Sequence, residues 1–103
     1  MRRLTELNRS VEGRVVLVTG AGGGQGRSTA HLFADEGAHV AVTDLGQNEV
    51  DAVVTEITDA GGSAAGWIMD VANADRVQQV TDEVASKFGG IDYLINNAGI
   101  SRF

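Results

Sequence analysis

A short apolar run that passes directly into glycines constrains this chain more than any other feature of its sequence. Residues 15–19 are apolar or β-branched, the run stops at Gly20, and further glycines extend to Gly26, where a helical pattern begins. A continuously apolar run is typical of a strand covered on both faces of a sheet. Glycines let the backbone turn tightly and approach a ligand, and the following helix aims unpaired N–H groups at the loop. The stretch therefore predicts a strand, loop and helix that hold a phosphate or pyrophosphate.

The rest of the chain alternates between helical and extended patterns. The expected helices cover residues 25–36, 48–60 and 74–88, and the expected strands after the first cover residues 39–43, 64–69 and 91–95. Short connections between alternating strands and helices require parallel strands joined by right-handed crossovers. The pattern predicts an α/β fold of the Rossmann type, a doubly wound parallel sheet of four strands in the order 3-2-1-4 with helices on both faces.

Composition limits the classes of function. The 103 residues are 43% hydrophobic and 21% charged, which is typical of one globular domain with a modest core. The net charge of −6 disfavours nucleic acid or an anionic membrane as partner, and the lack of cysteine excludes disulfides and thiolate metal sites. Residues 1–13 are polar and lack the apolar segment of a signal peptide. We expect a polar tail over residues 1–13, one domain over residues 14–103 and a cytoplasmic protein.

Three further motifs accompany the glycine loop. Asp44 ends the second strand, Asp70-Val71 ends the third, and Asn96-Asn97-Ala98-Gly99 follows the fourth. Together with the spacing Thr19-Gly20-x-x-x-Gly24-x-Gly26, these residues resemble the motifs of the short-chain dehydrogenase/reductase family over roughly residues 11–103. The resemblance implies an oxidoreductase that transfers hydride between a nicotinamide cofactor and an alcohol or ketone.

Asp44 bears on the choice of cofactor. It lies close to the interval of ~20 residues beyond the glycine motif at which an acid meets the adenosine ribose. A carboxylate there accepts hydrogen bonds from the ribose hydroxyls of NAD and repels the additional phosphate of NADP. Leu45, Gly22 and Gly23 carry no positive charge that would favour that phosphate. The sequence predicts NAD, although a solvated acid in a loop is the plain alternative for Asp44.

The resemblance also implies how the cofactor is held. In the family the acid equivalent to Asp70 bonds the adenine, the backbone of the next residue meets the ring, and Ala98 and Gly99 let the chain pass close to the ribose. Gln25 stands where most relatives carry Ile or Leu beneath the nicotinamide. No metal site is expected. The expected cofactor-binding residues are Gly20, Gly22, Gly23, Gly24, Gln25, Gly26, Asp44, Leu45, Asp70, Val71, Asn97, Ala98 and Gly99.

The catalytic Ser and Tyr-x-x-x-Lys of the family have no counterpart in these 103 residues. Tyr93 is the only tyrosine, Asn97 stands four residues after it, and Ser101 comes too early in the chain. We therefore expect the amino-terminal NAD-binding portion of such an enzyme, truncated before its catalytic half and inactive by itself. Strand four would lie on an open edge that favours self-association, whereas full-length relatives are usually homo-oligomers. The alternative is a non-enzymatic nucleotide-binding or partner-binding module.

Overall fold

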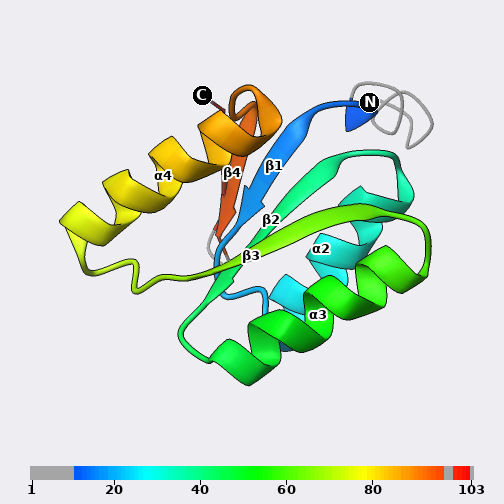
Figure 1. The fold of residues 1–103 in the computed structure, drawn as a ribbon, viewed down its shortest axis with the longest axis horizontal. Coiled ribbons are helices and arrows are strands. Elements are labelled where there is room, and N and C mark those ends of the chain that lie inside the picture. Colours follow the sequence, from blue (N-terminus) through cyan, green and yellow to red (C-terminus); the bar gives the residue numbers. More distant parts are fainter. Residues whose placement is uncertain (1–10, 97–98, 103) are drawn as a thin grey trace.

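A computed structural model describes residues 11–96 and 99–102 of the chain (Figure 1). Every strand and helix expected from the sequence is present, with ends that lie within two residues of the expected ones. The described elements are β1 (Val15–Val18), α2 (Gly24–Asp35), β2 (His39–Asp44), α3 (Gln47–Asp59), β3 (Ser63–Ile68), α4 (Ala74–Phe88), β4 (Tyr93–Asn96) and β5 (Gly99–Arg102).

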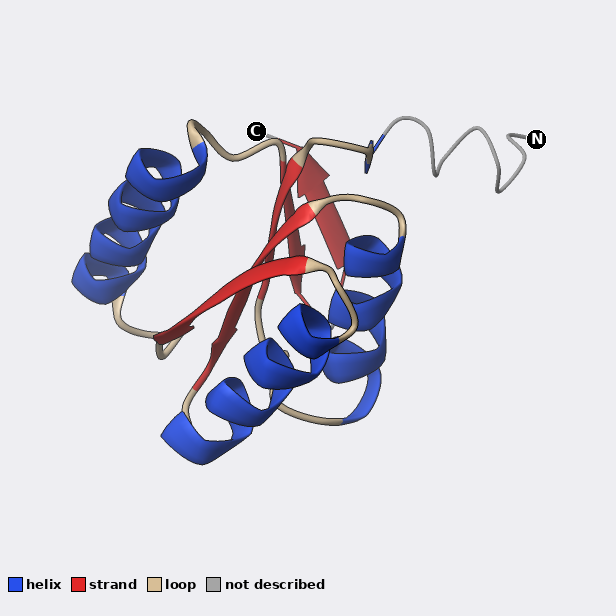
Figure 2. Ribbon diagram, turned by 45° about the vertical axis from the view of Figure 1, so that its right-hand side comes forward, coloured by secondary structure: helices blue, strands red, loops and turns tan. Residues whose placement is uncertain are grey.

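The strands form one sheet in the order β3-β2-β1-β4-β5, and the first four of these are parallel. In β1, Val16 pairs with Val40 of β2 on one side and with Tyr93 of β4 on the other. Figures 1 and 2 show α4 on one face of the sheet and α2 and α3 on the opposite face. The predicted parallel sheet of order 3-2-1-4 with helices on both faces is therefore confirmed.

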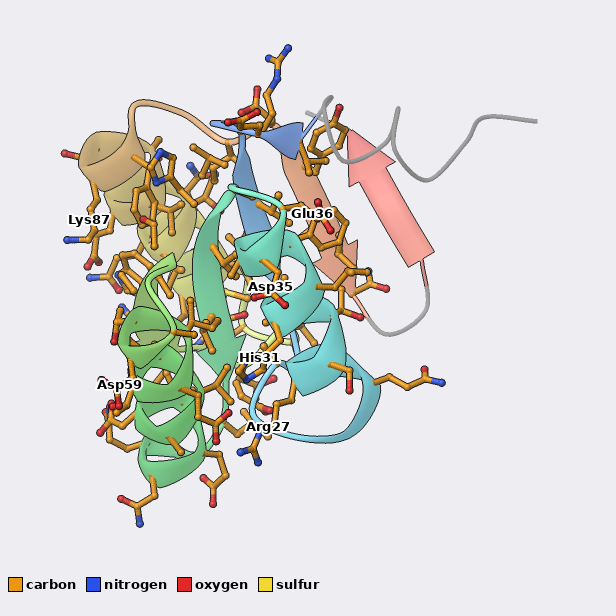
Figure 3. All side chains as sticks on the ribbon, turned by 90° about the vertical axis from the view of Figure 1, so that its right-hand side faces the viewer. Arg27, His31, Asp35, Glu36, Asp59 and Lys87 are labelled. Carbon is orange, nitrogen blue, oxygen red and sulfur yellow. The ribbon has the colours of Figure 1, made fainter. Side chains whose placement is uncertain are left out.

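The fifth strand differs from the expectation. β5 folds back antiparallel to β4, with Ser101 opposite Leu94 and Gly99 opposite Asn96. This strand, red in Figure 3, lies at the margin of the sheet. The expected open edge at strand four is wrong, because β5 takes up the hydrogen bonds on that side of β4. Self-association through the strand-four edge loses its structural basis for the same reason.

Both faces of β1 are buried. Val16 and Val18 pack with α2 and α3 in one cluster, whereas Val15 and Leu17 pack in a second cluster with α4. Successive side chains of a strand point to opposite faces, so a strand with helices on both sides is apolar at every position. This explains the uninterrupted run that precedes the glycines. Within the described residues, no helix combines the length and the apolar character needed to cross a bilayer.

The residues just before β1 pack onto the turn that follows α2. Val11 is only 3% exposed, its carbonyl accepts a 2.9 Å hydrogen bond from the Arg14 amide, and the Gly13 amide donates to the Gly37 carbonyl at 3.0 Å. Residues 1–10 lie outside the described residues. The division of the chain into a tail and one domain stays a prediction.

Candidate functional site

A pocket of about 580 Å³ lies at the carboxyl ends of the parallel strands. In the sheet, β2 lies on one side of β1 and β4 lies on the other, so the strand order reverses at β1. The pocket lies at this point of reversal. Open α/β sheets bind their ligands at this point. Five residues expected at the cofactor are brought together here, and they are Gly20, Asp44, Leu45, Asp70 and Val71.

The glycine loop reaches the pocket through Gly20 and needs glycine for two different reasons. Gly20 and Gly24 have φ angles of 62° and 57°, a left-handed conformation that side chains disfavour. Gly26 has an ordinary conformation, but a Cβ there would overlap the carbonyl oxygen of Gly20 and lie 2.7 Å from its carbon. The first turn of α2 therefore packs directly on the backbone of the loop.

The amino end of α2 suits an anion. Its N-cap residue, Gly23, makes no side-chain cap hydrogen bond, and no acidic residue stands in the first turn of the helix. By contrast, the side chain of Asn73 caps α4 by accepting from the Arg76 amide at 3.0 Å. Uncapped N–H groups together with the positive end of the helix dipole are the usual means of holding a phosphate.

Asp44 points at the glycine loop. Its Oδ2 accepts a 2.9 Å hydrogen bond from the Gly22 amide, and its Oδ1 accepts from the Leu45 amide at 2.8 Å. The Ala21 amide adds a 2.9 Å bond to the carbonyl of Thr43. The loop after β1 is thus fixed to the end of β2, with a carboxylate between them at the edge of the pocket.

Thr43 contributes to this junction and was not among the expected site residues. Its side chain is fully buried, and its Oγ1 donates a 2.9 Å hydrogen bond to the Val18 carbonyl. That bond joins the last residue of β1 to the residue before Asp44 in β2, close to the start of the glycine loop. A hydroxyl directly after three small apolar residues of a buried strand is the signal in the sequence, because buried polar groups need a partner.

The opposite rim of the pocket comes from the end of β3. The exposed side chain of Asp70 accepts a 2.9 Å hydrogen bond from the Ala72 amide, which shapes the turn into α4. Val71 is 65% exposed and Leu45, across the pocket, is 67% exposed. Two apolar side chains this exposed on the rim offer apolar contacts to a flat ring.

The remaining expected residues lie apart from the pocket lining or outside the described residues. Gly23, Gly24 and Gln25 are exposed at the start of α2. Gly99 begins β5, while Asn97 and Ala98 lie outside the described residues. The structure gives no observation that tests whether these residues contact the cofactor, so their expected roles in cofactor binding stay predictions.

Arg27, the cation that directly follows the glycine loop in the sequence, belongs to a charged cluster between α2 and α3. The guanidinium of Arg27 pairs through Nε and a terminal nitrogen with Glu56, and Nε2 of His31 lies 2.7 Å from Oε1 of the same carboxylate. Figure 3 shows Arg27 and His31 along one side of α2. The charge of Arg27 is therefore balanced within the protein.

The family model described as short chain dehydrogenase matches residues 14–103. The chain belongs to the short-chain dehydrogenase family. This is a family of oxidoreductases that use NAD or NADP.

Relatives of this chain differ in the substrates that their names give. The 3-oxoacyl-acyl-carrier-protein reductase FabG of Thermotoga maritima is 40% identical over 92 residues, which cover 89% of this chain and 37% of that protein. The D-threitol dehydrogenase of Mycolicibacterium smegmatis is also 40% identical, over 89% of this chain and 35% of that protein. The crystal structure of a hydroxysteroid dehydrogenase from Escherichia coli has a TM-score of 0.83 at 35% identity, over 86% and 38% of the two chains. The chain therefore spans little more than a third of the length of these relatives.

Proposed function

We propose that this chain is the NAD-binding portion of an oxidoreductase that transfers hydride between NAD and an alcohol or ketone. The pyrophosphate would lie against the uncapped first turn of α2, and the adenosine ribose would bond Asp44. The adenine would lie between Leu45 and Val71, with Asp70 at its edge. When bound, the nicotinamide supplies the group that accepts or donates the hydride. The residues of this chain bind and orient the cofactor.

One observation carries this proposal, namely the carboxylate of Asp44 at the pocket edge, bonded to the Gly22 amide. Each of its oxygens accepts one backbone N–H, and a carboxylate oxygen can accept a second hydrogen bond. Both ribose hydroxyls can therefore donate to a side chain that the protein already orients. A 2′-phosphate at the same place would meet a negative charge, while the nearby cation Arg27 is paired with Glu56.

The names of the relatives give different substrates, so we propose only that the substrate is an alcohol or a ketone. Acid–base catalysis needs a positioned proton donor, and the only tyrosine of the chain, Tyr93, has Asn97 in place of a lysine four residues later. We therefore expect these 103 residues to bind NAD without turning over a substrate by themselves. We further expect the complete enzyme to be a cytoplasmic homo-oligomer.

Calorimetric titration with NAD and NADP tests the proposal. We expect NAD to bind at least about tenfold more tightly, because like charges ~4 Å apart repel by about 1 kcal/mol even in water and a phosphate carries more than one charge. Asp44→Asn keeps an oxygen for the Gly22 amide but removes the charge, so the preference for NAD should shrink. Tighter binding of NADP than of NAD to the unaltered chain, or no binding of NAD at all, would contradict the proposal.

A further inference from the structure

A second acidic side chain, that of Glu49, lies close to Gly22, and Glu49 belongs neither to the sequence motifs nor to the pocket lining. A Cβ built on Gly22 would lie 2.8 Å from Oδ2 of Asp44 and equally 2.8 Å from Cβ of Glu49. The Gly22 backbone is therefore enclosed by two acidic side chains, one from the end of β2 and one from the first turn of α3.

The carboxylate of Glu49 turns back toward the start of its helix. A Cβ built on Gly46 would lie 2.7 Å from Cδ of Glu49 and would overlap its Oε2. Gly46 is the N-cap residue of α3 and follows Leu45, which lines the pocket. The two acids thus stand on either side of the short connection between β2 and α3, where the adenosine ribose would bind.

Glu49 also has a plain structural role. A glutamate at the third position of a helix commonly reaches back to the N-cap, and its charge complements the helix dipole. Gly46 supplies no side-chain cap, so the carboxylate of Glu49 is well placed to stabilise this end of α3. Such a role would act on the helix alone and would be indifferent to whether NAD or NADP is bound.

We propose that Glu49 is a second residue that determines cofactor specificity, because its negative charge adds to that of Asp44 against a 2′-phosphate. The inference rests on the proposed NAD site. Glu49 is exposed and need not touch the ribose of NAD, so its charge acts on NADP through space. Gly22 contributes to the same arrangement, because any side chain at this position would displace Asp44 or Glu49.

The test compares Glu49→Gln with a matched control on the same helix. Glu49→Gln keeps the length and one oxygen of the side chain and removes one negative charge. Asp59→Asn removes the same charge from the last residue of α3, which is exposed and ~15 Å along the helix from Glu49. Figure 3 labels Asp59 on α3. Calorimetry with NAD and with NADP is run at ionic strengths of about 0.01 M and 1 M, where charges act over ~30 Å and ~3 Å.

At low ionic strength Glu49→Gln should tighten the binding of NADP about three- to tenfold and change that of NAD less than about twofold. The gain should nearly vanish at high ionic strength, and Asp59→Asn should leave the ratio of the two affinities within about twofold of the unaltered chain. An unchanged ratio in Glu49→Gln, or equal weakening of both cofactors with a lower melting temperature, would overturn the inference in favour of a capping role alone. Absence of NAD binding in the unaltered chain would instead remove the proposed site, and the two failures are thereby distinguished.

Discussion

Replacing Gly26 with alanine tests the contact that brings the first turn of α2 onto the glycine loop. In an unconstrained helix this change stabilises by about 1 kcal/mol, because glycine is the poorer helix former. Here the new methyl group would overlap the carbonyl oxygen of Gly20 and lie 3.1 Å from Cα of Ala21. Both are backbone atoms that cannot rotate aside, so the cost of overpacking should reach the upper part of its usual range, about 3 kcal/mol. The net loss of stability should be about 2 kcal/mol.

Urea denaturation measures this loss through the fluorescence of Trp67, the only tryptophan, and through helical circular dichroism. With a urea dependence of about 1–2 kcal/mol per M, the midpoint should fall by about 1–2 M. NAD affinity should fall as well, because the first turn of α2 must move away from the loop. Gly23→Ala is the matched control, since the φ of Gly23 is −167° and nothing lies within 4 Å of a Cβ there. The control should lose less than about 1 kcal/mol, and equal stability of the two variants would refute the reasoning.

Two further substitutions test the junction before the loop and the cap of α4. Thr43→Val should cost about 1–2 kcal/mol in urea denaturation, because a buried 2.9 Å bond to the Val18 carbonyl is lost, whereas Thr58→Val on the exposed side of α3 should stay within about 0.5 kcal/mol. Similar losses in the two would contradict the role of Thr43. Asn73→Ala should lower stability by about 1 kcal/mol through loss of the 3.0 Å bond from the Arg76 amide, and Asn73→Asp should restore most of it. A thermal melt of the three proteins checks this, and an unchanged melt in Asn73→Ala would exclude the cap.

Periodicity and glycine placement were enough to predict the three helices and the parallel strands. The least regular of them, β3, contains Gly66, and the structure gives the reason for that glycine. A Cβ on Gly66 would run into Val50 and would lie 3.1 Å from Cγ2 of Val54, both on α3. The glycine lets α3 approach β3 closely. Its cause is a contact between elements distant in the chain, so a local pattern could not reveal it.

The fifth strand and the side-chain bonds of the site were beyond prediction for a similar reason. Gly99–Arg102 is short and has no alternating pattern, and it is a strand only because β4 offers it a partner. The motif spacing predicted Asp44 at the end of β2. The bond from the Gly22 amide to its carboxylate depends on the distance between the glycine loop and β2 in the folded chain, which the spacing does not give. The hydroxyl of Thr43 falls in the same class, since its acceptor lies on another strand.

The space around Gly22 makes cofactor preference a property of several residues at once. A basic side chain at this position would favour a 2′-phosphate, yet its Cβ would lie 2.8 Å from both Oδ2 of Asp44 and Cβ of Glu49. Such a residue could enter only if these neighbours shifted, and a shift of Asp44 would strain the bond from the Gly22 amide that fixes the loop to β2. A single substitution would therefore weaken the loop before it gained affinity for NADP. Conversion to NADP should need the loss of one or both acids together with the gain of a cation, because charge and space at this junction are set by the same three residues.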